Sequence, residues 1–188
     1  MSPVTHGLLS WLIAESGRLL RRDRALVTAA GVIPDLDGLG FAVELATRDS
    51  DHPLLWFSQY HHLFHNALFA ALAAAGAFAA ARRRWTTALL ALLAVHLHYL
   101  CDLAGARGPD GAQWPVPYFS PFVRDFELTW SGQWPLNGWP NFAITGAALA
   151  ASFCLAWARG YSPVGLFSER ADRAFVETLR RRFPRREV

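Results

Sequence analysis

The sequence contains no lysine and only two cysteines, and both scarcities limit what the chain can be. All basic residues are arginine, and the formal net charge is only +3, so no nucleic-acid partner is expected. Cys101 and Cys154 lie far apart, and neither belongs to a CxxC pair. A disulfide scaffold is therefore excluded, and we expect both thiols to be buried as small apolar side chains.

Charge is scarce as well. Charged residues make up 18% of the chain and hydrophobic residues 53%, whereas soluble domains typically carry about 25% charged residues. The first residues lack a positively charged region and a cleavage site, so no signal peptide is expected. We predict one domain over residues 1–188, with the last residues, 184–188, disordered.

The sequence also lacks the alternation of polar and apolar residues that is typical of strands, which predicts an all-α fold. Helices are predicted over about 3–20, 24–32, 41–47, 55 or 58 to 81, 85–104, 142–158 and 168–183. The stretch 105–141 is rich in Pro, Gly and Trp and is too long for a simple connection. We therefore predict a bundle of five to seven helices with a long functional loop.

Histidine and aspartate occur at helical spacing in two places. His61 and His65 are four residues apart, as are His98 and Asp102, and residues at this spacing share one face of a helix. His62 is an alternative to His61, because it lies three residues before His65. Taken alone, each pair is equally well explained by chance, and a single histidine on a helix is more often a hydrogen-bonded core residue.

Distances along the chain predict that these pairs meet. A turn at residues 82–84 would join two antiparallel helices, with His65 about 27 Å and Asp102 about 29 Å from the turn. The first two helices repeat the arrangement, since the first begins near His6 and the second ends before a PDLD segment. We therefore predict a metal site at one end of the bundle and arginines at the other. The candidate ligands are His6, Asp35, Asp37, His61, His62, His65, His98 and Asp102.

Histidine and carboxylate ligands without thiolate favour Zn²⁺, with Mn²⁺ or Fe as alternatives. The candidates exceed one tetrahedral site, which predicts two or three divalent ions. Such sites activate water and stabilise displacement at phosphorus, so they predict a metal-dependent hydrolase. Asp35 and Asp37 are also the candidate catalytic residues, either one serving as the general base. The alternative is a membrane protein that binds metal for structure or transport without catalysis.

Five segments resemble a family of bacterial metal-dependent hydrolases that includes small inner-membrane proteins. They are THGLLSW (5–11), GVIPDLDGL (31–39), HHLFHNALFA (61–70), HLHYLCDLAGARGPDG (96–111) and WSGQWPLNGWPN (130–141). The family is distantly similar to zinc-dependent phospholipase C and P1-type nucleases, which are all-α enzymes with three zinc ions. The resemblance implies as ligands His6, Asp35, Asp37, His65, His98 and Asp102. Tyr60 stands where many relatives have a histidine, so the choice between His61 and His62 stays open.

Three runs without charge, 66–81, 85–101 and 141–158, are slightly shorter than the ~20 residues that span a bilayer. Arginines at one end of each helix resemble the positive-inside pattern. Four tryptophans lie toward the opposite end, where they would form an interfacial belt or line a substrate groove; they are Trp114, Trp130, Trp134 and Trp139. We expect a bacterial inner-membrane protein with a small-molecule or lipid-like substrate, the alternative being a soluble cytoplasmic bundle. The amphipathic segment 169–186 is expected to lie on the cytoplasmic membrane surface.

Overall fold

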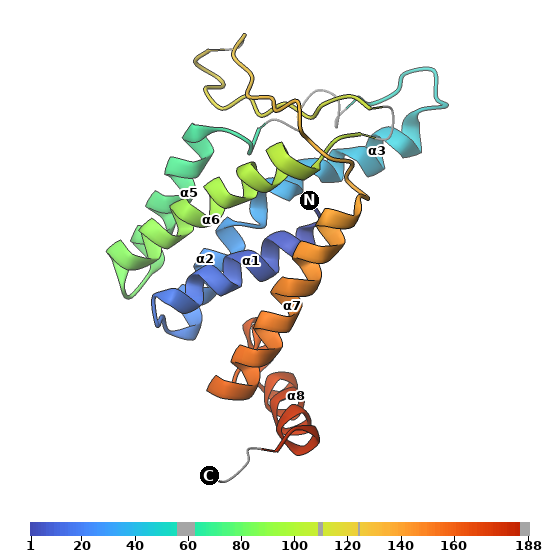
Figure 1. The fold of residues 1–188 in the computed structure, drawn as a ribbon. Helices are drawn as coiled ribbons and strands as arrows, with labels where there is room; N and C mark the ends of the chain where they lie inside the picture. Colours follow the sequence, from blue (N-terminus) through green and yellow to red (C-terminus); the bar gives the residue numbers. More distant parts are fainter. Residues whose placement is uncertain (56–62, 109–110, 124, 185–188) are drawn as a thin grey trace.

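The computed structural model describes residues 1–55, 63–108, 111–123 and 125–184. Over these residues the fold is helical, with two isolated β-bridges in the loops, which confirms the all-α prediction (Figure 1). The α-helices are α1 (Pro3–Ser16), α2 (Arg21–Ala30), α3 (Gly40–Thr47), α5 (Ala67–Ala80), α6 (Arg84–Gly105), α7 (Trp139–Arg159) and α8 (Glu169–Arg182). Two 3₁₀-helices, η1 (Ile33–Leu39) and η2 (Pro163–Leu166), join them.

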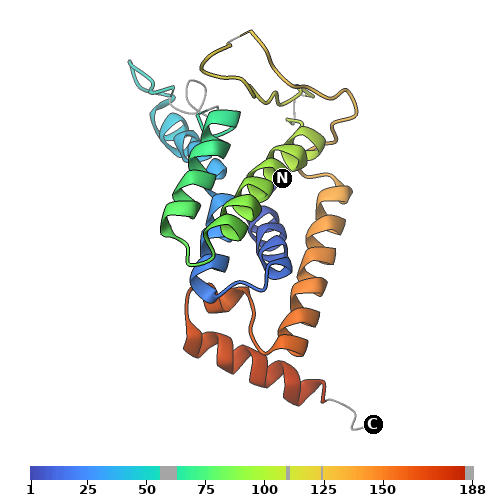
Figure 2. The ribbon, with the colours of Figure 1, turned by 90° about the vertical axis from the view of Figure 1, so that its left-hand side faces the viewer.

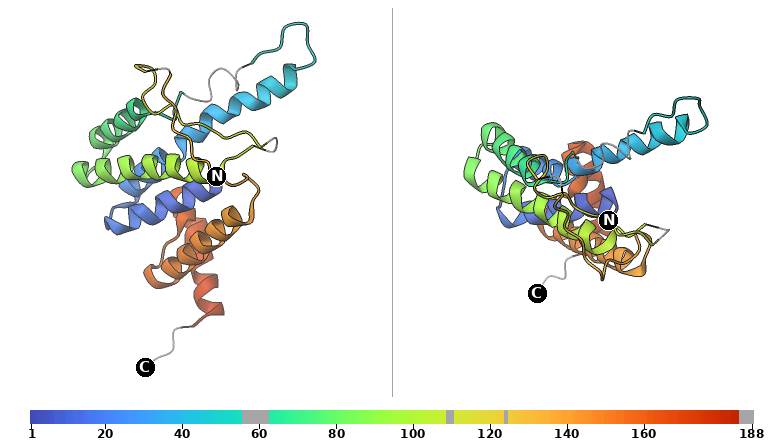
Figure 3. Two further views of the ribbon diagram at one scale, coloured as in Figure 1. Left: turned by 45° about the horizontal axis from the view of Figure 1, so that its top comes forward. Right: turned by 90° about the horizontal axis from the view of Figure 1, so that it is seen from above.

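The helices form a bundle with two distinct ends. α1, α2, α5 and α6 pack side by side, α7 packs along α1, and α8 turns across the end of α7 (Figures 1 and 2). The N-terminus and the loop between α6 and α7 lie at the other end, from which α3 projects (Figure 3). The loop that the sequence predicts to be functional is thus far from α8.

Two helix boundaries differ from the predicted ones for local reasons. α1 ends at Ser16 because the chain turns after Gly17, and Arg18 adopts a left-handed backbone conformation with φ of 47°. α5 begins at Ala67, later than the predicted start at 55 or 58, because the side chain of Asn66 caps it. His65 therefore precedes α5, and the predicted pairing of His61 with His65 falls partly on residues 56–62, which lie outside the described ones.

The contact between α2, α5 and α6 is rich in small side chains. Ala30, Ala70, Ala77 and Ala91 are buried between α2, α5 and α6. Small residues let helices approach closely, as in membrane proteins. The large apolar side chains of α6 and α7 instead face outward; the most exposed are Trp85, Leu89, Leu93, Leu100, Trp139 and Phe142. This arrangement leaves an apolar outer surface that water would not favour.

Among the described residues, α6 and α7 are the helices that are long and apolar enough to cross a membrane. Their 22 and 21 residues extend about 33 and 32 Å, which matches a hydrocarbon core of about 30 Å. α2 followed by η1 and α3 passes the same criterion as one unit bent by 46°. α5, predicted as a possible span, has only 14 residues and is too short.

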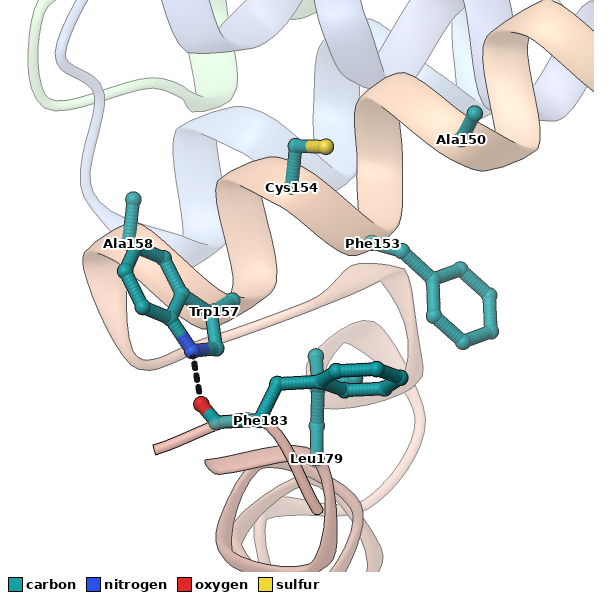
Figure 4. A pocket seen from close by; sticks show the side chains of 7 residues that line it. All are labelled: Ala150, Phe153, Cys154, Trp157, Ala158, Leu179 and Phe183. Carbon is teal, nitrogen blue, oxygen red and sulfur yellow. Dashed lines mark hydrogen bonds between the residues drawn. The ribbon is translucent and has the colours of Figure 1, made fainter. Parts of the chain in front are cut away.

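The positions of the two cysteines confirm one expectation and correct the other. Cys101 is buried, as expected, but Cys154 is exposed. Cys154 lies on α7 and borders a cavity that Leu179 of α8 also lines (Figure 4). The apolar surroundings of this thiol in the sequence therefore belong to an outer face of the bundle and not to its core.

Candidate metal centre

Three histidines converge on the carboxylate of Asp102. Oδ2 of Asp102 lies 3.0 Å from Nε2 of His98 and 3.4 Å from Nε2 of His65. Oδ1 lies 3.1 Å from Nε2 of His6, and the N-terminal amine of Met1 also contacts it. All four side chains are buried. The convergence predicted from spacing along the chain is therefore present at the atomic level.

The four side chains come from three separate parts of the fold. His6 lies in the first turns of α1, which begins where Ser2 accepts a hydrogen bond from the backbone of Thr5. His98 and Asp102 lie one turn apart on α6. Helix α1 and the α5–α6 hairpin therefore bring their ligands to the same end of the bundle.

His65 reaches the centre from the turn before α5, and this turn is held on both sides. The side chain of Asn66 accepts from the amide of Phe69 at 2.9 Å and donates to the carbonyl of Leu63 at 2.8 Å. The hydroxyl of Tyr99 lies 2.7 Å from the carbonyl oxygen of Phe64 and 2.9 Å from that of Asn66. Tyr99 follows His98 on α6, so this helix both supplies a ligand and fixes the turn that carries another.

In two of the histidines, the ring nitrogen that faces away from Asp102, Nδ1, also has a hydrogen-bond partner. Nδ1 of His98 lies 2.9 Å from the carbonyl oxygen of Gly31, and Nδ1 of His65 lies 3.0 Å from Oδ2 of Asp37. Histidines that bind metals typically donate their second ring N–H to a carbonyl or a carboxylate in this way. Each partner directs Nε2 of its ring toward Asp102.

Position 31 must also be occupied by glycine, for a steric reason. A Cβ atom at this position would lie only 1.9 Å from Oγ of Ser10, so α1 approaches the end of α2 too closely for any side chain. The small residue thus places the carbonyl that orients His98.

The spacing of the polar atoms fits a metal ion. Nε2 of His65 and Nε2 of His98 lie 3.1 Å apart, and both are within 3.4 Å of Oδ2 of Asp102. Ligand atoms around a tetrahedral Zn²⁺ ion are separated by about 3.3 Å. The three atoms are therefore spaced like ligands of one ion.

A second, overlapping group has the same character. His6, Asp35, His98 and Asp102 each offer one ligand atom, and these atoms all lie within 4.8 Å of one another. Among the described residues, Nδ1 of His6 and Oδ2 of Asp35 are buried without a hydrogen-bond partner. A buried carboxylate oxygen without a donor is unfavourable unless a cation completes it. This cluster of histidine and aspartate can thus hold a metal ion.

The pKa values of His6 and His65 are shifted in opposite directions. Burial lowers the pKa of His6 to about 4, so its ring is neutral and suited to coordination. Burial also opposes charge on His65, but hydrogen bonds to Asp102 and Asp37 outweigh it and raise the pKa of His65 to about 9. Binding of a divalent ion would displace that proton from between the two carboxylates.

A cavity of about 320 Å³ borders the cluster. Its polar wall contains Asp35, Asp37, His65 and Asp102, and its apolar wall contains Phe41, Trp114 and Leu136. The side chain of Gln133 fixes the loop at this point, because it donates to the carbonyl of Asp102 at 2.9 Å and accepts from the amide of Trp114 at 2.8 Å. The long loop therefore forms one wall of the site.

The eight predicted ligands have different positions. His6, Asp35, His65, His98 and Asp102 lie together, and Asp37 lies behind His65 with its Oδ2 on Nδ1 of that ring. The other two predicted ligands, His61 and His62, lie outside the described residues.

Other residues at this end have supporting roles. His96 is hydrogen-bonded to Tyr118 and to the carbonyl of Leu92 and does not contact Asp102. Sequence reasoning missed Gln133 and Tyr99, whose roles depend on carbonyl groups that leave no pattern in the sequence.

Comparison with known proteins does not place the chain in a family. No protein-family model, no curated protein and no solved structure matches it. The resemblance to bacterial metal-dependent hydrolases therefore stays a prediction from the sequence, and function is inferred from the geometry of the site.

Proposed function

We propose that the chain is a membrane-bound, metal-dependent hydrolase that acts on phosphoesters with an apolar part, such as lipids. The observation that carries this proposal is the convergence of His6, His65 and His98 on Asp102, each through Nε2. Two of these rings also have a polar partner on Nδ1, as histidines that bind metals typically do.

We propose two ions that share Asp102. One would be held by His65, His98 and Oδ2 of Asp102, which are spaced like ligands of one ion. The other would be held on the Oδ1 side, where His6 contacts Asp102 and Asp35 lies nearby. Zinc suits this combination of imidazole and carboxylate ligands. A third ion would depend on His61 or His62.

The chain's own groups then have separate tasks. Bound divalent ions would lower the pKa of a water molecule and neutralise charge on a phosphoryl group. Asp35 borders the cavity, and its carboxylate oxygen that does not hold the ion would accept the proton of the attacking water. Asp37 would hold His65 in orientation.

The surroundings of the centre favour an amphiphilic substrate. Phe41, Trp114 and Leu136 line the cavity together with the carboxylates. Segments at the same end expose large apolar side chains, including Phe122 (79% exposed) and Trp139 (78% exposed). A substrate with an apolar part would bind to these surfaces while its phosphoester reached the polar wall.

The distribution of charge supports a bacterial inner-membrane location. Arginines lie at the turn between α1 and α2, at the turn between α5 and α6, and at the end of α7. Cytoplasmic loops of inner-membrane proteins carry such an excess of basic residues. The metal centre would then lie toward the opposite, outer face of the membrane.

Two neighbouring histidines on α6 allow a matched test. The full chain, purified in detergent, is expected to contain about two zinc ions and to hydrolyse bis(p-nitrophenyl) phosphate. His98→Ala should lose both properties, because it removes a ligand. His96→Ala should keep both, because His96 is hydrogen-bonded to Tyr118 away from the centre.

Elemental analysis and hydrolysis are measured on the same samples. Full metal content in His98→Ala would show that the centre is assigned wrongly. Stoichiometric zinc without hydrolysis of either this ester or a phospholipid would favour the non-catalytic alternative, a membrane protein that binds metal for structure or transport.

A further inference from the structure

A second cavity lies at the opposite end of the bundle, between α7 and α8. This α7–α8 notch has a volume of about 700 Å³ and an almost entirely apolar lining (Figure 4). Its walls include Ala150, Phe153, Cys154 and Ala158 of α7, together with Leu179 of α8 and Phe183 just beyond it. A volume of this size is typical of sites for small organic ligands. The notch shares no residue with the metal centre.

Polar contacts around the notch fix its walls. Trp157 donates from Nε1 to the carbonyl of Phe183 at 2.6 Å (Figure 4), and Arg180 donates from Nε to the carbonyl of Trp157 at 3.0 Å. Oδ1 of Asp172 accepts from both the amide and the hydroxyl of Ser162, at 2.8 and 2.6 Å. These bonds hold α8 against the end of α7 while the notch stays open.

The chain reverses direction sharply between the two helices. Gly160 has φ of 85°, a left-handed conformation that favours glycine, and it ends α7. α8 then runs across the end of α7 instead of extending it (Figure 2). If α7 crosses a bilayer, α8 lies along the surface of that bilayer.

Arginine borders the notch on its α8 side, because Arg180 donates to the carbonyl of Trp157, which is one of the lining residues. Arg180, Arg181 and Arg182 form the last turn of α8 and are exposed; Arg181 is paired with Glu177, so Arg180 and Arg182, the latter next to Phe183 of the lining, supply the cations of the rim. Phe167, just before α8, is 89% exposed, and Phe183, just after it, is 61% exposed. Exposed aromatic side chains beside arginines are typical of helices that lie at a membrane interface. The rim therefore presents cations to a negatively charged headgroup, and the notch presents an apolar surface to a hydrocarbon chain.

From this combination we infer that the α7–α8 notch binds one anionic phospholipid. An acyl chain occupies the apolar space along α7, and the phosphate lies against the arginines in the last turn of α8. The charge complementarity between rim and headgroup selects an anionic lipid over a neutral one. The inference does not depend on the metal centre, since the two sites are built from different helices.

The headgroup part is tested by native mass spectrometry of the full chain in detergent. Phosphatidylglycerol and phosphatidylcholine with identical acyl chains are added separately. Wild type should retain one phosphatidylglycerol per chain. Its affinity should be about thirtyfold higher than for phosphatidylcholine, because the choline cation offsets the phosphate charge that would otherwise attract two arginines. The variant Arg180→Gln/Arg182→Gln should bind the two lipids equally, whereas Arg170→Gln/Arg173→Gln, in the first half of α8, should keep the preference. Equal binding of both lipids by wild type would overturn the inference.

The acyl-chain part is tested by filling the notch. Ala150→Trp should abolish the lipid adduct, whereas Ala143→Trp, an equally exposed alanine of α7 outside the notch, should leave it unchanged. Alkylation of Cys154 gives a second measurement, because bound phosphatidylglycerol should slow it in wild type and not in Ala150→Trp. Unchanged binding by Ala150→Trp would refute the site, as would a dimer mass showing that a second copy of the chain covers the notch.

Discussion

The two ends of the bundle both bury carboxylates, but they satisfy them in different ways. At the arginine end, Asp23 is completely buried and accepts hydrogen bonds from the backbone amides of Arg82 and Arg83, at 3.0 and 2.9 Å. These donors belong to the backbone and cannot lose their protons. They attach the turn between α5 and α6 to the beginning of α2.

Glu15 at the same end is satisfied by fixed positive charge. Its carboxylate pairs with Arg24 and Arg159, and it accepts a hydrogen bond from the hydroxyl of Tyr161 at 2.8 Å. Arginine stays protonated under all ordinary conditions, so this buried charge is always compensated. The arginine end therefore compensates the charge of both buried carboxylates with its own residues.

The carboxylates at the metal end face groups that can gain or lose protons. Asp102 is surrounded by imidazole rings from three separate segments, and one buried oxygen of Asp35 has no partner among the described residues. The difference indicates that one end serves to close the fold, whereas the other is organised to receive a cation.

The largest effect is expected when one buried aspartate at each end is replaced by asparagine. Asp102→Asn should remove the metal, because an amide is a poor ligand and Asp102 is shared by all three histidines. Asp23→Asn should keep the metal but lower the free energy of unfolding by about 1–3 kcal/mol, because an amide can accept only one of the two N–H groups well. Elemental analysis and denaturant unfolding of both variants measure the two effects.

One result of this experiment would contradict the comparison. If Asp23→Asn lost metal as completely as Asp102→Asn, the arginine end and the metal end would be one coupled unit and would not have separate roles.

Chelation is expected to act on the metal end alone. A ligand present at 1,000 times its dissociation constant stabilises the folded chain by about 4 kcal/mol, so removal of zinc should lower the melting temperature of wild type. Asp23→Asn should show the same decrease from a lower starting temperature. Asp102→Asn should melt at the same temperature with and without chelator, and any decrease there would point to a zinc site elsewhere in the chain.

Much of this contrast follows from local rules that the sequence displays. The rise of an α-helix and the spacing of His98 and Asp102 are enough to predict that the α5–α6 hairpin gathers its ligands at one end. The same arithmetic places His6 near the PDLD segment. These predictions succeed because they depend only on regular helix geometry and on one turn at residues 82–84.

The remaining features depend on contacts between distant segments. The start of α5 was predicted too early because capping by Asn66 outweighs the apolar character of the preceding residues. Asp37 was predicted as a ligand or base, but only the tertiary structure shows that its Oδ2 contacts the far nitrogen of His65. The exposure of Cys154 depends on which face of α7 the bundle leaves uncovered, and composition alone does not reveal this.

The smallest expected effect concerns two tyrosine hydroxyls, one at each end. Tyr99→Phe removes the hydroxyl that contacts the carbonyls of Phe64 and Asn66, and thereby loosens the turn that carries His65. Tyr161→Phe removes the hydroxyl that donates to Glu15 at the arginine end. Both variants should lose about 1 kcal/mol of unfolding free energy, since each loses one hydrogen bond.

Only Tyr99→Phe should also weaken zinc binding, by roughly tenfold, because a less ordered His65 loses about 1.4 kcal/mol of coordination. Competition with a chromogenic chelator measures this affinity in both variants. Equal zinc affinity in the two would mean that the turn before α5 is held in place without Tyr99, and that the metal end tolerates the same loosening as the arginine end.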